Sequence, residues 1–255
     1  METDRLNPVT LVTGAACGMG AMCARTLSSR STGGLILIDT DEAALSAVAD
    51  KLERRGVTPE RLSTLAFDVA DEDRWTQAGA FIKAQYGRLD WAIVSADPPP
   101  APASDLVQWG RKLPQDLNGA FFSLRALMPL MHLNMSGGAI IVTGGADALP
   151  SETRTADFNL LQLVRAAALE GAHDNIRINL VAPGETTAWA HVPRFNDLVR
   201  EGGSERIAFD TLSHMPTPMA RYSVEEDVMR LIGMLLSDDS PMTGAALIVD
   251  GGHPL

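Results

Sequence analysis

The chain has 255 residues, 45% of them hydrophobic, and its 32 acidic residues outnumber its 21 basic ones, for a formal net charge of −11. No apolar run reaches the roughly 18 residues that a membrane span requires, and the first seven residues, Met1 to Asn7, lack the apolar core of a secretory signal. These features predict a cytoplasmic protein and disfavour a membrane or a nucleic acid as its partner. The length fits one α/β domain of about 250 residues.

The scarce tyrosines and lysines exclude one kind of catalytic pair. The chain has two tyrosines and three lysines, which are Tyr86, Tyr222, Lys51, Lys83 and Lys112. Asp90 stands four residues after the first tyrosine and Glu226 four residues after the second. Because the chain contains no Tyr-x-x-x-Lys sequence, a mechanism that depends on this pair is excluded.

The two cysteines, Cys17 and Cys23, are six residues apart. Zinc sites use closer pairs that are matched by a second such pair, and disulfides are rare in the cytosol. We therefore expect both cysteines to be small space-filling residues, and the sequence predicts no metal site.

Short apolar runs alternate with amphipathic stretches along the whole chain, which predicts strands separated by helices. The expected strands cover residues 9–13, 35–38, 61–67, 90–95, 138–143, 176–182 and 246–249. The expected helices cover residues 18–30, 41–55, 71–86, 104–133 with an interruption at Pro114, 155–172, and 223–236 with Ser223 as the N-cap. Continuous apolar strands of this kind are typical of parallel sheets. The sequence thus predicts an α/β, Rossmann-like, doubly wound fold: one domain over residues 1–255 with a seven-stranded parallel sheet flanked by helices on both faces.

A glycine-rich turn, Thr13-Gly-Ala-Ala-Cys-Gly-Met-Gly20, follows the first expected strand and precedes the first expected helix. Such a turn lets backbone N–H groups approach a pyrophosphate at the positive end of a helix. Asp39 ends the second expected strand and is placed to bind the 2′-hydroxyl of an adenosine ribose. Its charge would repel the 2′-phosphate of NADP, and residue 17 is Cys rather than Arg, so NAD (or NADH) is the predicted cofactor. In the alternative interpretation, Asp39 only caps the next helix.

Five motifs together resemble those of the short-chain dehydrogenase/reductase family, in the family's order. They are the glycine-rich turn, Asp68-Val69, Leu117-Asn118-Gly119, Asn175-Ile-Arg-Ile-Asn-Leu-Val-Ala-Pro-Gly184, and Thr243-Gly244 followed by Val249-Asp-Gly-Gly252. The resemblance implies a doubly wound fold, oxidoreductase chemistry and a nicotinamide cofactor. It also implies that the cofactor is bound by Gly14, Cys17, Gly18, Met19, Gly20, Asp39, Asp68, Val69, Ala96, Pro183, Gly184 and Thr187.

The chain departs from this family at the catalytic positions. The catalytic Ser, Tyr and Lys of the family fall at Gly145, Phe158 and Gln162, so Asn118 is the one member of the tetrad that remains. Phe158 cannot transfer a proton, and Gln162 carries no charge that would lower a neighbouring pKa. Since general acid–base catalysis contributes roughly 10²–10⁴-fold, the standard reaction by the standard route should be severely impaired.

Other polar residues fall in the region that faces the nicotinamide in relatives. Asp147 or Glu185 can serve as a base where burial raises its pKa, and Arg165 can replace the lost positive charge one helical turn beyond Gln162. The remaining candidates are Asp97, Thr143, Asp157, Asn159 and, within a substrate lid over residues 185–222, Trp189, His191 and His214. Taken singly, each of these is explained more simply as an ordinary loop, surface or helix-end residue.

Three hypotheses for the function stay open. The favoured one is a non-catalytic or regulatory subunit that binds NAD(H), as a homo-oligomer or together with an active paralogue. The second is an enzyme that uses a different acid/base residue on a small-molecule or acyl substrate, or that catalyses a non-redox reaction. The third, a scaffold without nucleotide, is disfavoured by the retained glycines, Asp39 and Asp68.

The expected partner surface lies on two long helices. In relatives, the helices that correspond to residues 116–133 and 155–172 form the contacts between subunits. An apolar stripe on the second helix fits an interface, although a core-facing side would give the same pattern. Its members are Phe158, Leu161, Val164 and Ala168.

Overall fold

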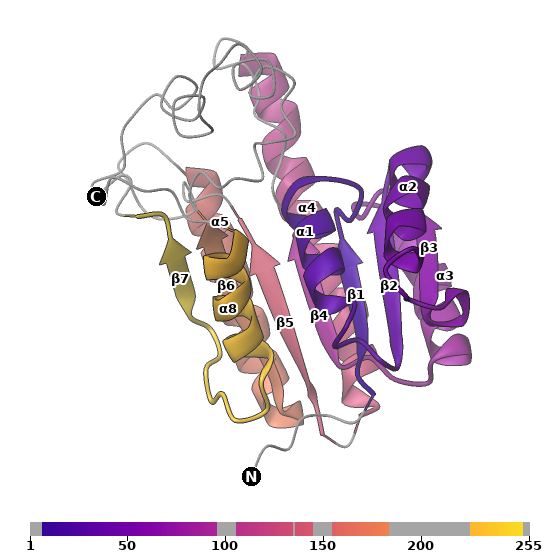
Figure 1. Ribbon diagram of the computed structural model, residues 1–255. Helices are drawn as coiled ribbons and strands as arrows, with labels where there is room; N and C mark the ends of the chain where they lie inside the picture. Colours follow the sequence, from indigo (N-terminus) through magenta and orange to yellow (C-terminus); the bar gives the residue numbers. More distant parts are fainter. Residues whose placement is uncertain (1–6, 96–105, 135, 145–154, 184–224, 252–255) are drawn as a thin grey trace.

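The computed structural model describes residues 7–95, 106–134, 136–144, 155–183 and 225–251. Seven strands form a single parallel sheet in the order β3-β2-β1-β4-β5-β6-β7, and all their carboxyl ends meet at one edge (Figure 1). The strands are β1 (Val9–Thr13), β2 (Gly34–Asp39), β3 (Leu62–Ala66), β4 (Trp91–Ser95), β5 (Gly138–Thr143), β6 (Ile176–Pro183) and β7 (Ala246–Val249). The predicted seven-stranded parallel sheet is therefore confirmed.

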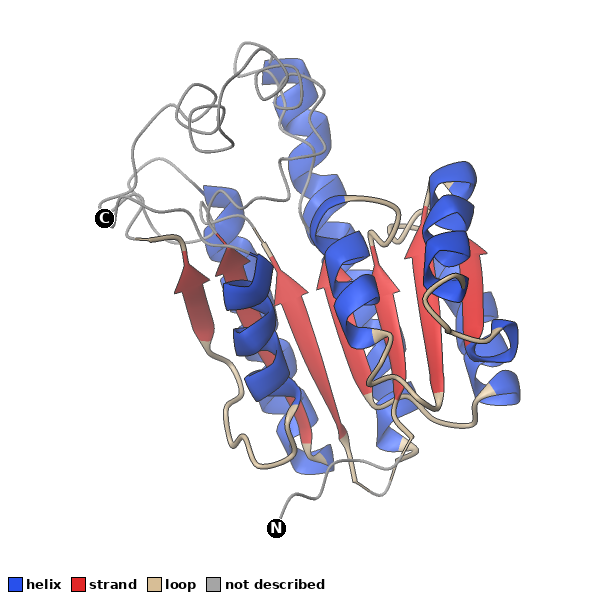
Figure 2. Cartoon of the chain, viewed as in Figure 1, coloured by secondary structure: helices blue, strands red, loops and turns tan. Residues whose placement is uncertain are grey.

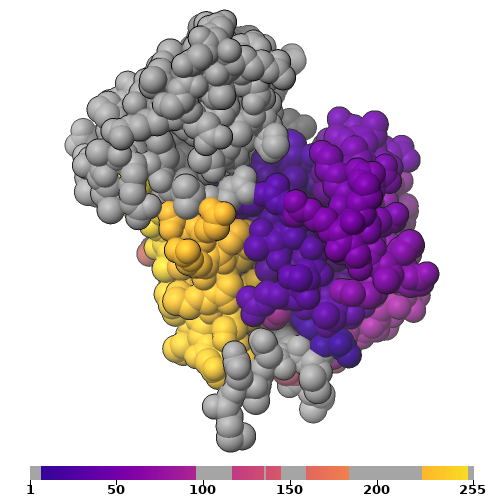
Figure 3. Space-filling model, viewed as in Figure 1, coloured from indigo at the N-terminus to yellow at the C-terminus, as the bar shows by residue number. Residues whose placement is uncertain are grey.

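Helices cover both faces of the sheet (Figure 2). One face carries α1 (Gly18–Leu27), α2 (Glu42–Glu53) and α8 (Glu225–Leu236), which hide the sheet in the space-filling view (Figure 3). The other face carries α3 (Glu72–Gln85), α4 (Leu106–His132) and α5 (Thr155–Gly171). Two short 3₁₀ turns, Pro59–Arg61 and Ala172–Asp174, complete the described elements. Because alternate side chains of each strand enter opposite cores, the central strands are mostly apolar.

Two predicted helix limits are wrong. The first helix ends at Leu27 rather than at about residue 30; at this end the hydroxyls of Ser28 and Ser31 also bind the carbonyls of Arg25 and Leu27. The expected interruption at Pro114 is absent, since α4 runs unbroken over 27 residues. A proline removes one backbone hydrogen bond, which does not end a helix whose following turns are buried.

The apolar stripe of α5 faces the core. Leu161, Val164 and Ala168 are almost fully buried against the sheet, while the side chain of Phe158 lies outside the described part. The stripe therefore packs inside the subunit, and the interpretation of it as an interface is wrong for these three residues. Among the large apolar side chains of α5 whose burial is described, Leu169 is exposed, at 77%.

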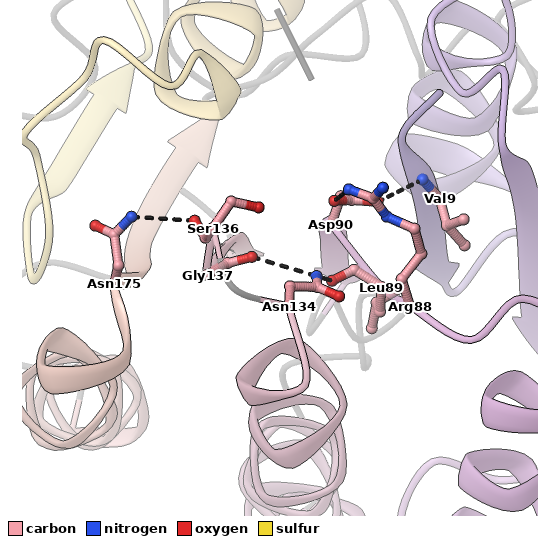
Figure 4. A network of polar contacts seen from close by, with 8 residues as sticks. All are labelled: Val9, Arg88, Leu89, Asp90, Asn134, Ser136, Gly137 and Asn175. Atoms are coloured by element: carbon pink, nitrogen blue, oxygen red, sulfur yellow. Dashed lines mark hydrogen bonds and ion pairs between the residues drawn. The ribbon is translucent and has the colours of Figure 1, made fainter. Parts of the chain in front are cut away.

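Polar contacts fasten the amino edge of the sheet, opposite the carboxyl ends (Figure 4). Asp90, which precedes β4 and is fully buried, accepts a hydrogen bond from the Val9 backbone and binds the Arg88 guanidinium through both carboxylate oxygens. The Asn134 amide, just after α4, donates to the carbonyls of Leu89 and Gly137. These contacts join β1, β4 and the segment that enters β5.

No helix within the described ranges is long and apolar enough to cross a membrane.

Candidate functional site

The glycine-rich turn lies at the carboxyl edge, between β1 and α1. Gly14 and Gly18 have φ angles of +62° and +52°, a backbone conformation that residues other than glycine rarely adopt. A Cβ on Gly20 would lie 2.1 Å from the Gly14 carbonyl oxygen, so this glycine allows α1 to pack directly on the turn. A Cβ on Gly18 would meet no atom within 4 Å, so a ligand has room at that point. The three glycines thus form the cradle that a pyrophosphate requires.

The amino end of α1 presents no side-chain cap. Its N-cap residue, Cys17, makes no side-chain hydrogen bond, and the first turn contains no acidic residue. In contrast, α2 and α3 are capped by the carboxylates of Asp41 and Asp71, which accept hydrogen bonds from the backbones of Ala44 and Arg74. The positive end of the α1 dipole is therefore directed at the open space above the turn, which favours an anion there.

The exposed thiol of Cys17 stays neutral. Although the residue is exposed overall, partial burial of the thiol and then the charges of Asp39 and Asp41 raise its pKa above the ordinary value. The residue therefore adds no negative charge to the cradle, and it offers no positive charge to a phosphate. Cys23 is buried, and its thiol contacts the Met229 sulfur of α8 at 3.8 Å, in agreement with a space-filling role.

Asp39 joins the end of β2 to the glycine-rich turn. One carboxylate oxygen accepts a hydrogen bond from the Ala16 backbone at 2.9 Å, and the other accepts one from the Asp41 backbone at 3.2 Å. Because Asp41 is the N-cap of α2, the interpretation of Asp39 as the helix cap is wrong. The half-buried carboxylate instead fixes the turn, and a carboxylate can accept further hydrogen bonds besides these two.

The segment after β3 is also held in place. Asp68 is exposed and accepts a hydrogen bond from the Ala70 backbone at 2.9 Å, which forms a tight local turn. The carbonyl of Val69 accepts a hydrogen bond from the Trp75 indole, and the Val69 side chain packs against α4 at Gly119. These contacts set Asp68 beside the end of β2, on the side of the sheet expected for the adenosine.

The opposite side of the carboxyl edge is formed by the ends of β4, β5 and β6. Ser95 donates its backbone N–H to the Thr13 hydroxyl at 3.0 Å and pairs with Thr143 in the sheet. Thr143 is fully buried, and Pro183 is buried as well. Several predicted site residues follow these strand ends and lie outside the described residues: Ala96, Asp97, Gly145, Asp147, Gly184, Glu185, Thr187, Trp189, His191 and His214.

The helices place the remaining predicted residues. Asn118 is exposed within α4, and Gln162 is exposed on α5 one turn after Phe158. Tyr86 ends α3 far from the carboxyl edge, where its hydroxyl lies 2.7 Å from the Ser63 hydroxyl. Lys51 and Lys83 are exposed on α2 and α3, near the ends of these helices that meet the amino edge. None of these three residues can replace the absent Tyr-x-x-x-Lys pair.

Sequence reasoning missed the contacts that fix this edge. The bond between Asp39 and Ala16 and the bond between Ser95 and Thr13 link residues that are 23 and 82 positions apart. The signal for the second was the threonine that ends β1, but only the sheet order shows that the end of β4 lies beside it.

Comparison with known proteins decides the family. A family model described as enoyl-(acyl carrier protein) reductase matches residues 14–253. The chain belongs to the short-chain dehydrogenase/reductase family. Members of this family are oxidoreductases that use NAD(P)(H), and the glycine cradle and the unprotected end of α1 fit such a dinucleotide.

Relatives in this family match the chain over nearly its full length. Two are the trans- and cis-4-hydroxycyclohexanecarboxylate dehydrogenases of Sinomonas cyclohexanicum. The first is 28% identical and the alignment covers 98% of this chain and 95% of that protein; the second is 31% identical and the alignment covers 96% of each. The crystal structure of an oxidoreductase of the same family from Burkholderia thailandensis superposes with a TM-score of 0.77 at 26% identity, covering 97% of this chain and 92% of that one.

Proposed function

We propose that this short-chain dehydrogenase/reductase is an NAD(H)-dependent oxidoreductase in which a group other than tyrosine transfers the proton. The observation that carries the proposal is the intact dinucleotide cradle, fixed by the hydrogen bond between Asp39 and Ala16. Relatives named as dehydrogenases match the chain from end to end, which favours an enzyme over a subunit without turnover.

The charge at the end of β2 favours NAD over NADP. The Asp39 carboxylate lies where the adenosine ribose is expected and would repel a 2′-phosphate. The thiol of Cys17, held neutral by its raised pKa, supplies no opposing positive charge. We therefore assign NADH as the preferred reduced cofactor.

The proton must come from the chain at a new position. When bound, the nicotinamide supplies hydride transfer, and the reacting oxygen of the substrate needs a proton donor or acceptor. Phe158 and Gln162 occupy the usual positions and cannot provide it. Asp147 and Glu185 follow the ends of β5 and β6, and we assign the acid/base role to one of these carboxyl groups. Asn118 of α4 is the retained member of the usual set.

The substrate class follows from the relatives and the family model. We propose a small alicyclic hydroxy acid or ketone, with an acyl thioester as the alternative that the family description supports. The purified chain is tested for NADH binding by cofactor fluorescence and then assayed with both classes. Failure to bind NADH at high concentration would refute the proposal.

Three substitutions locate the proton donor. If one carboxyl group acts, Asp147→Asn or Glu185→Gln abolishes turnover and leaves NADH affinity unchanged, whereas Phe158→Ala retains turnover. The matched gain-of-function variant combines Gly145→Ser, Phe158→Tyr and Gln162→Lys, which restores the family's catalytic groups. Increased turnover in that variant shows that the pocket admits the substrate.

A second candidate function, that of a non-catalytic subunit, rests on the three positions where the family's catalytic residues are replaced. A subunit that binds NAD(H) without turnover needs no Ser, Tyr or Lys, and Gly145, Phe158 and Gln162 are what such a chain would carry. It is supported if the chain binds NADH, shows no activity alone with either substrate class, and increases the activity of a co-encoded relative.

We also propose that the chain assembles with a second copy or with a paralogue through α4 and α5. These helices expose Phe121, Leu133 at the end of α4, and Leu169, which are 42%, 50% and 77% accessible in the single chain. Light scattering after gel filtration gives the mass of the assembly. A monomer at micromolar concentration would contradict the proposal for the homo-oligomer.

A further inference from the structure

One buried hydroxyl near the carboxyl edge has no partner in the protein. Among the described residues, eight polar or charged residues are buried: Thr10, Thr13, Ser28, Ser31, Asp90, Ser123, Thr143 and Asn179. Seven of them have side-chain hydrogen bonds. The hydroxyl oxygen of Thr143 is fully buried and makes none. A buried polar atom without a partner is destabilising, so its presence calls for an explanation.

The fold itself does not require a hydroxyl at this position. Thr143 pairs with Ser95 of β4 and Val181 of β6, and the Gly144 backbone that follows donates to the Val181 carbonyl at 3.1 Å. The ladder is therefore complete without the side chain. A valine has nearly the same shape and β-propensity and would satisfy the same packing. At the end of β1, Thr13 shows the contrast, because its hydroxyl holds the Ser95 backbone.

The position of Thr143 points to a ligand. It is the last residue of β5, and the order of the sheet reverses between β1 and β4, the place where doubly wound sheets bind dinucleotides. Asp39 lies on the β2 side of this point, so the nicotinamide half extends over β4 and β5. Residues at alternate positions of β5, Ala139 and Ile141, belong to the core that includes Met19 of α1. Thr143 thus shares the face of the sheet on which the phosphate cradle begins α1.

We infer that the Thr143 hydroxyl is a binding residue for the nicotinamide half of the cofactor, which supplies the missing hydrogen bond. This inference rests on the proposed NADH binding. The resemblance placed Thr143 only in the region near the nicotinamide, and the unpartnered hydroxyl now gives it a specific contact. A primary carboxamide such as that of nicotinamide offers both a donor and an acceptor, so either orientation of the hydroxyl is satisfied.

The test compares stability and affinity in one variant, Thr143→Val. Removal of an unpartnered hydroxyl should raise the melting temperature of the free protein by about 2–4 °C. The same change should weaken NADH binding about tenfold in calorimetry, and leave the affinity for ADP-ribose, which lacks nicotinamide, unchanged. Thr143→Ser keeps the hydroxyl and should keep the wild-type affinity for NADH.

Thr10→Val is the matched control. Thr10 is equally buried in β1, but its hydroxyl shares a hydrogen bond of 2.7 Å with the Ser31 hydroxyl. This variant should melt at a lower temperature and bind NADH as the wild type does. Unchanged NADH affinity in Thr143→Val, or equal losses for NADH and ADP-ribose, would overturn the assigned contact while the proposed function stands. If the wild-type chain binds neither ADP-ribose nor NADH at any concentration tested, both the assigned contact and the proposed function are refuted.

Discussion

Replacing Gly20 by alanine tests whether the glycine-rich turn depends on direct contact with α1. A Cβ at this position would lie 2.1 Å from the Gly14 carbonyl oxygen and 2.8 Å from that of Thr13. Ordinary contacts begin near 3.4 Å, so α1 must move away from the turn by about 1.3 Å, and backbone atoms on both sides resist that movement.

The expected penalty is about 3 kcal/mol, at the upper end for overpacked sites, because neither contact atom belongs to a flexible side chain. For a chain of this size, that corresponds to a melting temperature lower by roughly 6–12 °C in differential scanning calorimetry. We also expect NADH affinity to fall more than tenfold, since the displaced helix carries the backbone N–H groups of the cradle.

Gly79→Ala is the control for the substitution itself. Gly79 lies inside α3, and a Cβ there would meet no atom within 4 Å. Alanine should therefore stabilise the protein by about 0.5–1 kcal/mol through the lower entropy of the unfolded chain. The described packing of α1 on the turn is refuted if the Gly20→Ala variant binds NADH normally and its melting temperature lies within about 2 °C of the wild type, which corresponds to a negligible change in stability.

Three further predictions concern the same edge. Gly18→Ala should cost about 1 kcal/mol for its positive φ, yet lower NADH affinity more than tenfold in calorimetry, because the methyl group enters space that the cradle leaves open. Asp39→Asn should shift the ratio of NADPH to NADH affinity about tenfold toward NADPH; an unchanged ratio would contradict the charge argument. Asn179→Ala removes side-chain bonds to Met242 and Ala245 at 2.8 and 3.1 Å, and should lower stability to denaturant by about 2–3 kcal/mol with NADH affinity unchanged.

The regular part of the fold was predictable because its signals are local. Apolar runs and amphipathic periodicity located all seven strands, and the acidic residues Asp41 and Asp71 marked the starts of α2 and α3. Pro114 misled, because a single lost hydrogen bond is a local signal whereas the continuity of α4 depends on packing of its later turns against the sheet.

The candidate site was predictable in composition but not in its connections. The glycines and Asp39 were identified from spacing, and the structure places them together at the carboxyl edge. The bond from Asp39 to Ala16 and the unpartnered hydroxyl of Thr143 depend on strand order and on which face a side chain occupies. The apolar stripe of α5 shows the same limit, because a core and an interface produce one periodicity.

The polar network around Asp90 lies at the opposite edge of the sheet from the candidate cofactor site, so the contacts that stabilise the strands are separate from the site. Asp90, Arg88 and Asn134 tie strands together at one end of the sheet, while the glycine-rich turn and Asp39 lie at the other. A substitution among the reacting groups therefore leaves these ties untouched. Replacement of a serine, tyrosine or lysine at the opposite edge is therefore expected to leave the sheet held together at this end. For the same reason, this sheet is a suitable frame on which new reacting groups can be installed.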